Sequence, residues 1–123
     1  VLNAQKIVVE NAKPGITLRD LNKLVVDYYT RELPKHGLNK DVSEYYFHGV
    51  SHHLGLDTHD VNVGNAPLVA GNVITNEPGL YIEDENIGIR IEDDLLITGT
   101  GATILSCDVP KEIADIERIA ARS

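Results

Sequence analysis

The segment from residue 48 to residue 60 contains four of the chain's five histidines: His48, His52, His53 and His59. Imidazole titrates near neutral pH and is the commonest metal ligand among side chains. This clustering favours a functional site over four separate structural histidines. His53 directly follows His52, so we expect it to face away and to take no part in catalysis. Asp57 and Asp60 either hydrogen-bond imidazole N–H groups and fix their tautomers or form part of an exposed polar surface.

Two glutamates further along the chain could complete a metal centre. Glu77 ends a predicted strand and is followed by Pro78-Gly79, a rigid turn. Glu92 lies in a predicted strand whose alternation puts Arg90, Glu92 and Asp94 on one face. Arg90 could keep a buried carboxylate charged or orient a neighbouring ligand, although the same spacing suits an exposed salt-bridged strand. Histidines with well-separated glutamates are the ligand set of a hydrolytic metal centre.

The elements that must position these residues follow an α+β order. Thr17 followed by Asp20 resembles a capping box that starts a helix. Apolar periodicity and turn residues predict helices over 1–12, 18–33 and 113–120, strands over 73–75, 80–82, 88–98 and 102–105, and loops over 13–15, 62–72 and 83–86. We therefore expect helices that cover one face of a mainly antiparallel sheet.

Composition limits the class of protein. A chain of 123 residues is one domain or a piece of one, and its net charge of -8 argues against a nucleic-acid partner. A single cysteine, Cys107, excludes an internal disulfide. No signal peptide and no apolar run near the roughly 18 residues of a membrane span is present. We expect a cytoplasmic protein without a membrane partner, and the start at Val1 indicates a fragment of a longer protein.

Three blocks of this sequence together resemble the aminopeptidase P and prolidase family of pita-bread metallopeptidases. The blocks are residues 48–60, 76–82 and 88–94, in the family's order and approximate spacing, and the match extends over essentially the whole chain. The sequence of residues 51–60 is more similar to that of aminopeptidase P than to those of prolidase or methionine aminopeptidase. The resemblance implies that residues 1–123 are the C-terminal half of a catalytic domain with the pita-bread fold.

The resemblance also implies a role for each matching residue. His52, Glu77 and Glu92 would ligate metal, with Glu92 bridging two ions, and Glu77 would also transfer a proton. His59 would bind the substrate and stabilise the tetrahedral intermediate. His48 would line the proline pocket, and Arg90 would support the ligands. The family uses two divalent ions, most often manganese, with zinc or cobalt as alternatives. A hydroxide shared by the ions attacks the Xaa-Pro bond of peptide substrates that carry proline at the second position.

One departure from the family concerns two further aspartate ligands, which come from an upstream half that this chain does not match. We therefore expect the parent protein to be an Xaa-Pro aminopeptidase and this fragment alone to bind metal weakly and to be inactive. Apolar surface left exposed by the missing half would favour a homo-oligomer. The alternatives are a prolidase that cleaves only Xaa-Pro dipeptides and a non-catalytic pita-bread binding module, against which the three retained ligands argue.

Overall fold

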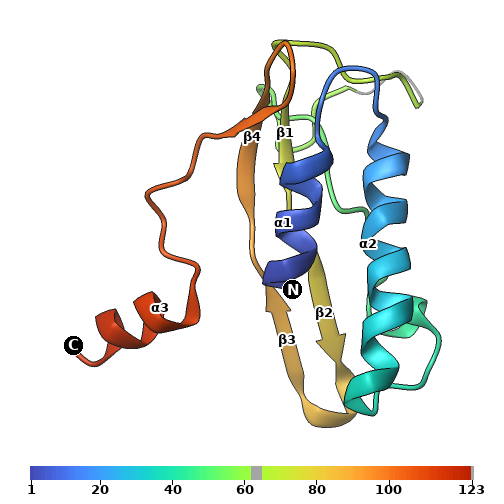
Figure 1. The fold of residues 1–123 in the computed structure, drawn as a ribbon, viewed down its shortest axis with the longest axis vertical. Helices are drawn as coiled ribbons and strands as arrows, with labels where there is room; N and C mark the ends of the chain where they lie inside the picture. The colour runs from blue at the N-terminus through green and yellow to red at the C-terminus, as the bar shows by residue number, and fades with distance from the viewer. Residues whose placement is uncertain (62–64, 123) are drawn as a thin grey trace.

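The computed structural model describes residues 1–61 and 65–122 and shows two helices packed against antiparallel strands, with a third helix set apart (Figure 1). The helices are α1 (Leu2–Asn11), α2 (Leu18–Glu32) and α3 (Ile113–Ala120), and short 3-10 turns span Leu33–His36, Val42–Glu44 and Glu83–Glu85. The strands are β1 (Val73–Asn76), β2 (Gly79–Ile82), β3 (Ile87–Arg90), β4 (Asp93–Ile97) and β5 (Ala102–Ile104). The expected α+β order is confirmed, while residues 62–64 of the expected loop 62–72 lie outside the described residues.

Helix α2 begins at the predicted capping box. The Thr17 hydroxyl accepts a hydrogen bond from the Asp20 backbone N–H at 3.1 Å, and the Asp20 carboxylate accepts one from the Thr17 backbone N–H at 3.0 Å. Both N–H groups would otherwise lack a partner at the helix start. The helix then turns an apolar face to the core, with Leu21, Val25 and Tyr29 buried.

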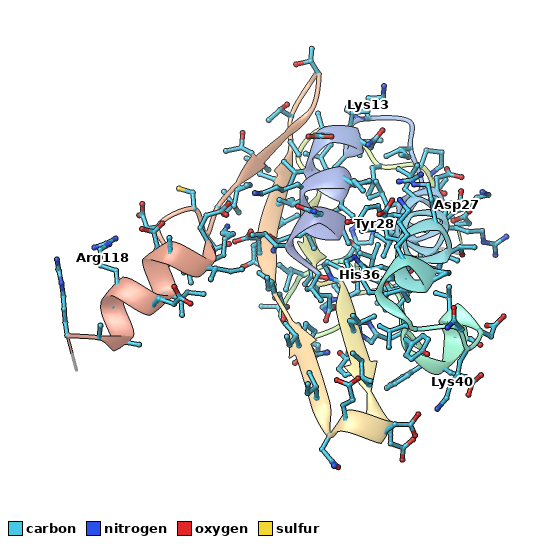
Figure 2. All side chains as sticks on the ribbon, turned by 60° about the horizontal axis from the view of Figure 1, so that its bottom comes forward. Lys13, Asp27, Tyr28, His36, Lys40 and Arg118 are labelled. Carbon is cyan, nitrogen blue, oxygen red and sulfur yellow. The ribbon has the colours of Figure 1, made fainter. Side chains whose placement is uncertain are left out.

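Helices α1 and α2 cover the strands and form the core with them. Ala4 and Val8 of α1 are fully buried, and they belong to the same cluster as Ile74, Leu95 and Ile97 of the strands. Helix α3 does not join this layer: both views place it away from α2, and the labelled Arg118 of α3 and Asp27 of α2 lie on opposite sides of the strands (Figures 1 and 2). None of the described helices combines the length and apolar character needed to cross a membrane.

The expected single strand over 88–98 is wrong, because the chain breaks it into β3 and β4. Strand β4 pairs with β1, with Asp93 opposite Asn76, and β3 pairs with β2, with Arg90 opposite Gly79. The pairing register of the β2–β3 ladder continues that of the β1–β4 ladder, so the two ladders are parts of one antiparallel ribbon. Between them lies an unpaired stretch, residues 77–78 against 91–92, which we call the ribbon break. Pro78 contributes to it, because proline has no N–H to donate.

Candidate metal centre

His52 reaches the ribbon break because residues 50–54 run alongside β1. The backbone N–H of Glu77 donates to the Val50 carbonyl at 2.8 Å, and that of Thr75 donates to the His52 carbonyl at 2.9 Å. An antiparallel bridge between His53 and Ile74 continues this pairing. The Glu77 N–H is therefore used by the histidine segment rather than by the β1–β4 ladder. This pairing brings His52 next to a glutamate that follows it by many residues in sequence.

Three of the side chains singled out from the sequence meet at the ribbon break. One ligand atom each from His52, Glu77 and Glu92 lie within 4.8 Å of one another. His52 Nε2 is 3.1 Å from Glu77 Oε1, and both side chains are largely buried, whereas Glu92 is exposed. Glu77 and Glu92 would be the next opposed pair after Asn76 and Asp93, and opposed residues share one face of a ribbon. The ribbon thus presents two carboxylates to the same imidazole.

The tautomer of His52 suits metal ligation. Its Nδ1 lies 3.0 Å from the His53 carbonyl oxygen, which only accepts, so Nδ1 donates and Nε2 is the ring atom left to bind a metal. Nε2 then faces a carboxylate oxygen, and this contact is attractive only with a proton or a cation between them. Both ring nitrogens of His52 have these other partners, and Asp57 and Asp60 are exposed, in line with the alternative of an exposed polar surface. Imidazole with two carboxylates is a donor set that fits a divalent transition-metal ion.

The Glu77 carboxylate has two further partners that fix its direction. The Thr75 hydroxyl donates to Glu77 Oε1 at 3.1 Å, and Arg90 Nη1 lies 3.5 Å from Glu77 Oε2. The Glu77 side chain is only 12% exposed, and these contacts offset the cost of burying its charge. The structure therefore places Arg90 behind a candidate ligand. Thr75 was missed by the sequence analysis, and the available signal was its position two residues before Glu77 on the same strand face.

Two of the remaining histidines, His48 and His59, border a hollow of about 290 Å³ that His52 and Glu77 also line. Its lining residues are His48, Gly49, Ser51, His52, His59, Glu77 and Arg90. The His59 ring meets the His52 ring edge to face, with centroids 4.4 Å apart. The lining does not include His53, which pairs through its backbone with β1.

His48 is held by hydrogen bonds at both ring nitrogens. Nδ1 lies 2.9 Å from the Gly49 carbonyl oxygen, so it donates, and Nε2 accepts from the Tyr81 hydroxyl at 2.8 Å. Its ring also packs edge to face against Tyr46, with centroids 4.9 Å apart. The sequence analysis did not identify Tyr81, although it belongs to the block of residues 76–82. Tyr46 and Tyr81 thus hold the His48 ring in place where it lines the hollow.

Comparison with known proteins shows to which family the chain belongs. Residues 1–99 match the profile of metallopeptidase family M24. The chain belongs to this family. An M24 relative, an Xaa-Pro aminopeptidase of Haemophilus influenzae, is 41% identical over 141 residues that cover 97% of this chain and 33% of that protein.

Two solved structures show the same fold. A putative aminopeptidase P from Bacillus anthracis superposes with a TM-score of 0.93 and 48% identity over 99% of this chain and 30% of that one. Aminopeptidase P from E. coli with the inhibitor Pro-Leu gives a TM-score of 0.90 and 37% identity over 99% of this chain and 33% of that one. The expected α+β, pita-bread fold is thereby confirmed. The chain spans about a third of the length of these relatives.

Proposed function

We propose that the intact protein is an Xaa-Pro aminopeptidase and that residues 1–123 are the C-terminal half of its catalytic domain. The observation that carries this proposal is the meeting of His52, Glu77 and Glu92 within 4.8 Å in a chain of the M24 family. The substrate class, peptides with proline at the second position, is supported by the names of the relatives. A homo-oligomeric state and a cytoplasmic location stay predictions.

The three clustered side chains would hold two divalent ions, with manganese as the first candidate and zinc or cobalt as alternatives. Bound divalent ions lower the pKa of water and polarise a substrate carbonyl. Glu92, exposed at the ribbon break, would serve both ions, as the family resemblance implies. Two carboxylates and one imidazole are too few donors for two ions. Two aspartates from an upstream half would complete the site, so the fragment alone would bind metal weakly and be inactive.

Other side chains of the hollow would act on protons and substrate. Glu77 would accept the proton of the attacking water, while Arg90 and Thr75 keep its carboxylate aimed at the site. His59 is exposed beside His52 and would donate to the substrate oxygen on which negative charge develops. The family resemblance implies these roles for Glu77, His59 and Arg90, and support for them comes from the hollow, which all three line.

His48 would receive the proline ring of the substrate. Its two nitrogens are occupied by Gly49 and Tyr81, so the imidazole offers a fixed ring face rather than a free proton donor. Phe47 stacks at 4.9 Å between centroids on Tyr81 and is 69% exposed. An apolar wall of this kind suits a pyrrolidine ring, which cannot donate a hydrogen bond.

The test uses the intact protein, stripped of metal and reloaded with manganese, on an Xaa-Pro-Xaa tripeptide and an Xaa-Pro dipeptide. We expect release of the first residue from the tripeptide and a loss of more than about a hundredfold in kcat/KM for Glu92→Ala, since even residues that only support a metal ligand cost 10–100-fold. Glu85→Ala, an exposed glutamate in the hairpin loop, is the control and should change nothing.

Three results would contradict the proposal in different ways. Full activity of Glu92→Ala would remove the metal site from the mechanism. Hydrolysis of the dipeptide alone would identify a prolidase. Manganese binding without hydrolysis of either peptide would identify a non-catalytic binding module.

A further inference from the structure

The reverse face of the ribbon break carries a second set of buried polar groups. Asn76 and Asp93 are opposed in the β1–β4 ladder, one residue before Glu77 and one residue after Glu92. Side chains alternate along a strand, so Asn76 and Asp93 point away from the face that presents the two glutamates. Asn76 is fully buried and Asp93 is 2% exposed. Buried polar groups of this kind need partners.

Both oxygens of the Asp93 carboxylate are paired by the segment after β5. Ser106 Oγ donates to Asp93 Oδ1 at 2.6 Å, and Lys111 Nζ lies 2.5 Å from Asp93 Oδ2. Ser106 Oγ also accepts from the Asp94 backbone N–H at 3.1 Å. The Lys111 side chain is only 18% exposed, so its charge is largely removed from water. Such a pair persists only where geometry and hydrogen bonds are good, and it holds both partners in one place.

The other strand is held from the same side by helix α1. Asn76 Nδ2 donates to the Gln5 carbonyl at 3.0 Å, and Gln5 itself is 2% exposed. Each candidate glutamate ligand is therefore adjacent in sequence to a residue anchored on the reverse face. The two anchors differ in strength, because an amide hydrogen bond holds Asn76 whereas a buried ion pair holds Asp93.

Glu92 depends on this anchoring more than Glu77 does. The Glu77 side chain has Thr75 and Arg90 as partners, and its N–H pairs with Val50. Glu92 lies between β3 and β4, outside both ladders, with an exposed side chain. Its carboxylate is therefore placed by the backbone of the residue that follows it, Asp93.

We propose that Lys111 is a positioning residue for the metal centre: through the buried Asp93 carboxylate it fixes the backbone that aims Glu92 at the ions. This inference rests on the proposed function, since it concerns the same metal centre. Lys111 touches neither metal nor substrate. Its contribution is preorganisation, because a ligand already held in its binding geometry loses less freedom when the ion binds.

A purely structural role for Lys111 would affect folding and leave the affinity of the folded protein for metal unchanged. The chain offers a matched control for this distinction. Lys6 of α1 pairs with Glu112 at 2.7 Å and ties the same segment to the body of the protein, but both side chains are about half exposed and the pair does not include Asp93. Lys6→Met therefore loosens the segment without uncovering Asp93.

The experiment measures the Kd of Mn²⁺ by calorimetry on the metal-free intact protein, with the Tm of each variant recorded beside it. We expect Lys111→Met to raise the Kd about tenfold, Lys111→Arg to recover most of that loss, and Lys6→Met to leave the Kd unchanged. An unchanged Kd in Lys111→Met, whatever its Tm, overturns the inference. An equal loss in Lys6→Met also overturns it, because attachment of the segment would then be the cause.

Ser106→Ala keeps the inference testable if Lys111→Met does not fold. It removes the second donor to Asp93 with a small change in volume, and we expect a smaller rise in the Kd of Mn²⁺. An unchanged Kd in that variant would overturn the inference. If the wild-type protein binds none of Mn²⁺, Zn²⁺ and Co²⁺, the proposed function fails and this inference fails with it. If the wild-type protein binds metal and Lys111→Met binds it equally well, the inference alone is refuted.

Discussion

At the residue scale, His52 and Glu77 of the candidate metal centre are oriented by hydrogen bonds and ion pairs to neighbouring groups. His52 uses Nδ1 on a backbone carbonyl and turns Nε2 to the site, and Glu77 receives a hydroxyl on one oxygen and a guanidinium near the other. These contacts hold the ligand atoms of both side chains in one direction, which favours metal affinity.

Thr75 is the residue whose loss would test this arrangement most directly. Its hydroxyl donates to Glu77 Oε1 at 3.1 Å and accepts from the backbone N–H of His52 at 3.0 Å. We expect Thr75→Val to raise the Kd of Mn²⁺ by about tenfold, because both ligands lose a partner, and Thr75→Ser to restore it. Calorimetric titration of the intact protein measures both. Equal Kd values for valine and threonine would show that the hydroxyl is dispensable.

The sequence alone predicted the ligand candidates but not their supports. His52, Glu77 and Glu92 stood out by residue type and by the blocks that contain them. Thr75 and Tyr81 are ordinary strand residues in the sequence, and their roles appear only when the histidine segment pairs with β1 or approaches β2. Such partners are set by long-range contacts, which periodicity and spacing do not encode.

At the scale of elements, features set by residues close in sequence were predicted correctly, whereas a feature set by a neighbouring strand was not. The capping box and the apolar periodicity of α2 lie within a few residues of each other and were read correctly. The break between β3 and β4 has no glycine or proline of its own, because it arises opposite Pro78 on the neighbouring strand. The sequence of residues 88–98 therefore reads as one strand.

The capping box of α2 should make a pH-dependent contribution to stability. The hydrogen bond from the Thr17 side chain, followed by that from its backbone, holds the pKa of Asp20 below its ordinary value of 3.8. A lowered pKa in the folded state means that the stabilisation is fully present above pH 3.8 and is lost as the pH falls through the folded pKa. We expect the difference in free energy of unfolding between wild type and Asp20→Ala to be constant near neutrality and to shrink in acid. Denaturant titrations at several pH values measure it, and a difference that persists in acid would contradict it.

Gly79 at the start of β2 should resist even a small side chain. A Cβ at this position would lie 2.5 Å from the Tyr81 hydroxyl and 2.7 Å from the ring carbon that bears it. We expect Gly79→Ala to displace the Tyr81 ring, break its bond to His48 and lower the free energy of unfolding by about 1–3 kcal/mol. Chemical denaturation measures the change. Gly99→Ala is the control because nothing lies within 4 Å of its Cβ, and equal effects of the two variants would refute the steric argument.

At the scale of the whole molecule, helix α3 is the element whose position the sequence did not predict. Its isoleucines give a clear apolar face, and the expectation was that this helix, like the other two, would cover one face of the sheet. In the structure these side chains stay exposed: Ile113 at 72%, Ile116 at 49% and Ile119 at 45%. An amphipathic pattern shows that one face of a helix favours burial, but it does not show against which surface that face packs.

The exposed face of α3 leads to a prediction for the isolated 123-residue chain. We expect it to self-associate at micromolar concentrations, because burying these isoleucines between copies removes apolar surface from water. Ile116→Glu should shift the population towards monomer, while the control Asp115→Asn on the same helix should not. Sedimentation velocity distinguishes the species, and a monomeric wild type would contradict the prediction.

The shared pairing register of the two ladders has a consequence for how chain length can vary. Adding or deleting one residue between the hairpin loop and either glutamate, within 78–82 or 87–91, would turn that glutamate to the opposite face and take it out of the site. The hairpin loop at 83–86, beyond the last pair Ile82 and Ile87, can lengthen without disturbing either ladder. Homologues that keep both glutamates should therefore place their insertions and deletions at this loop and conserve the number of residues on either side of it.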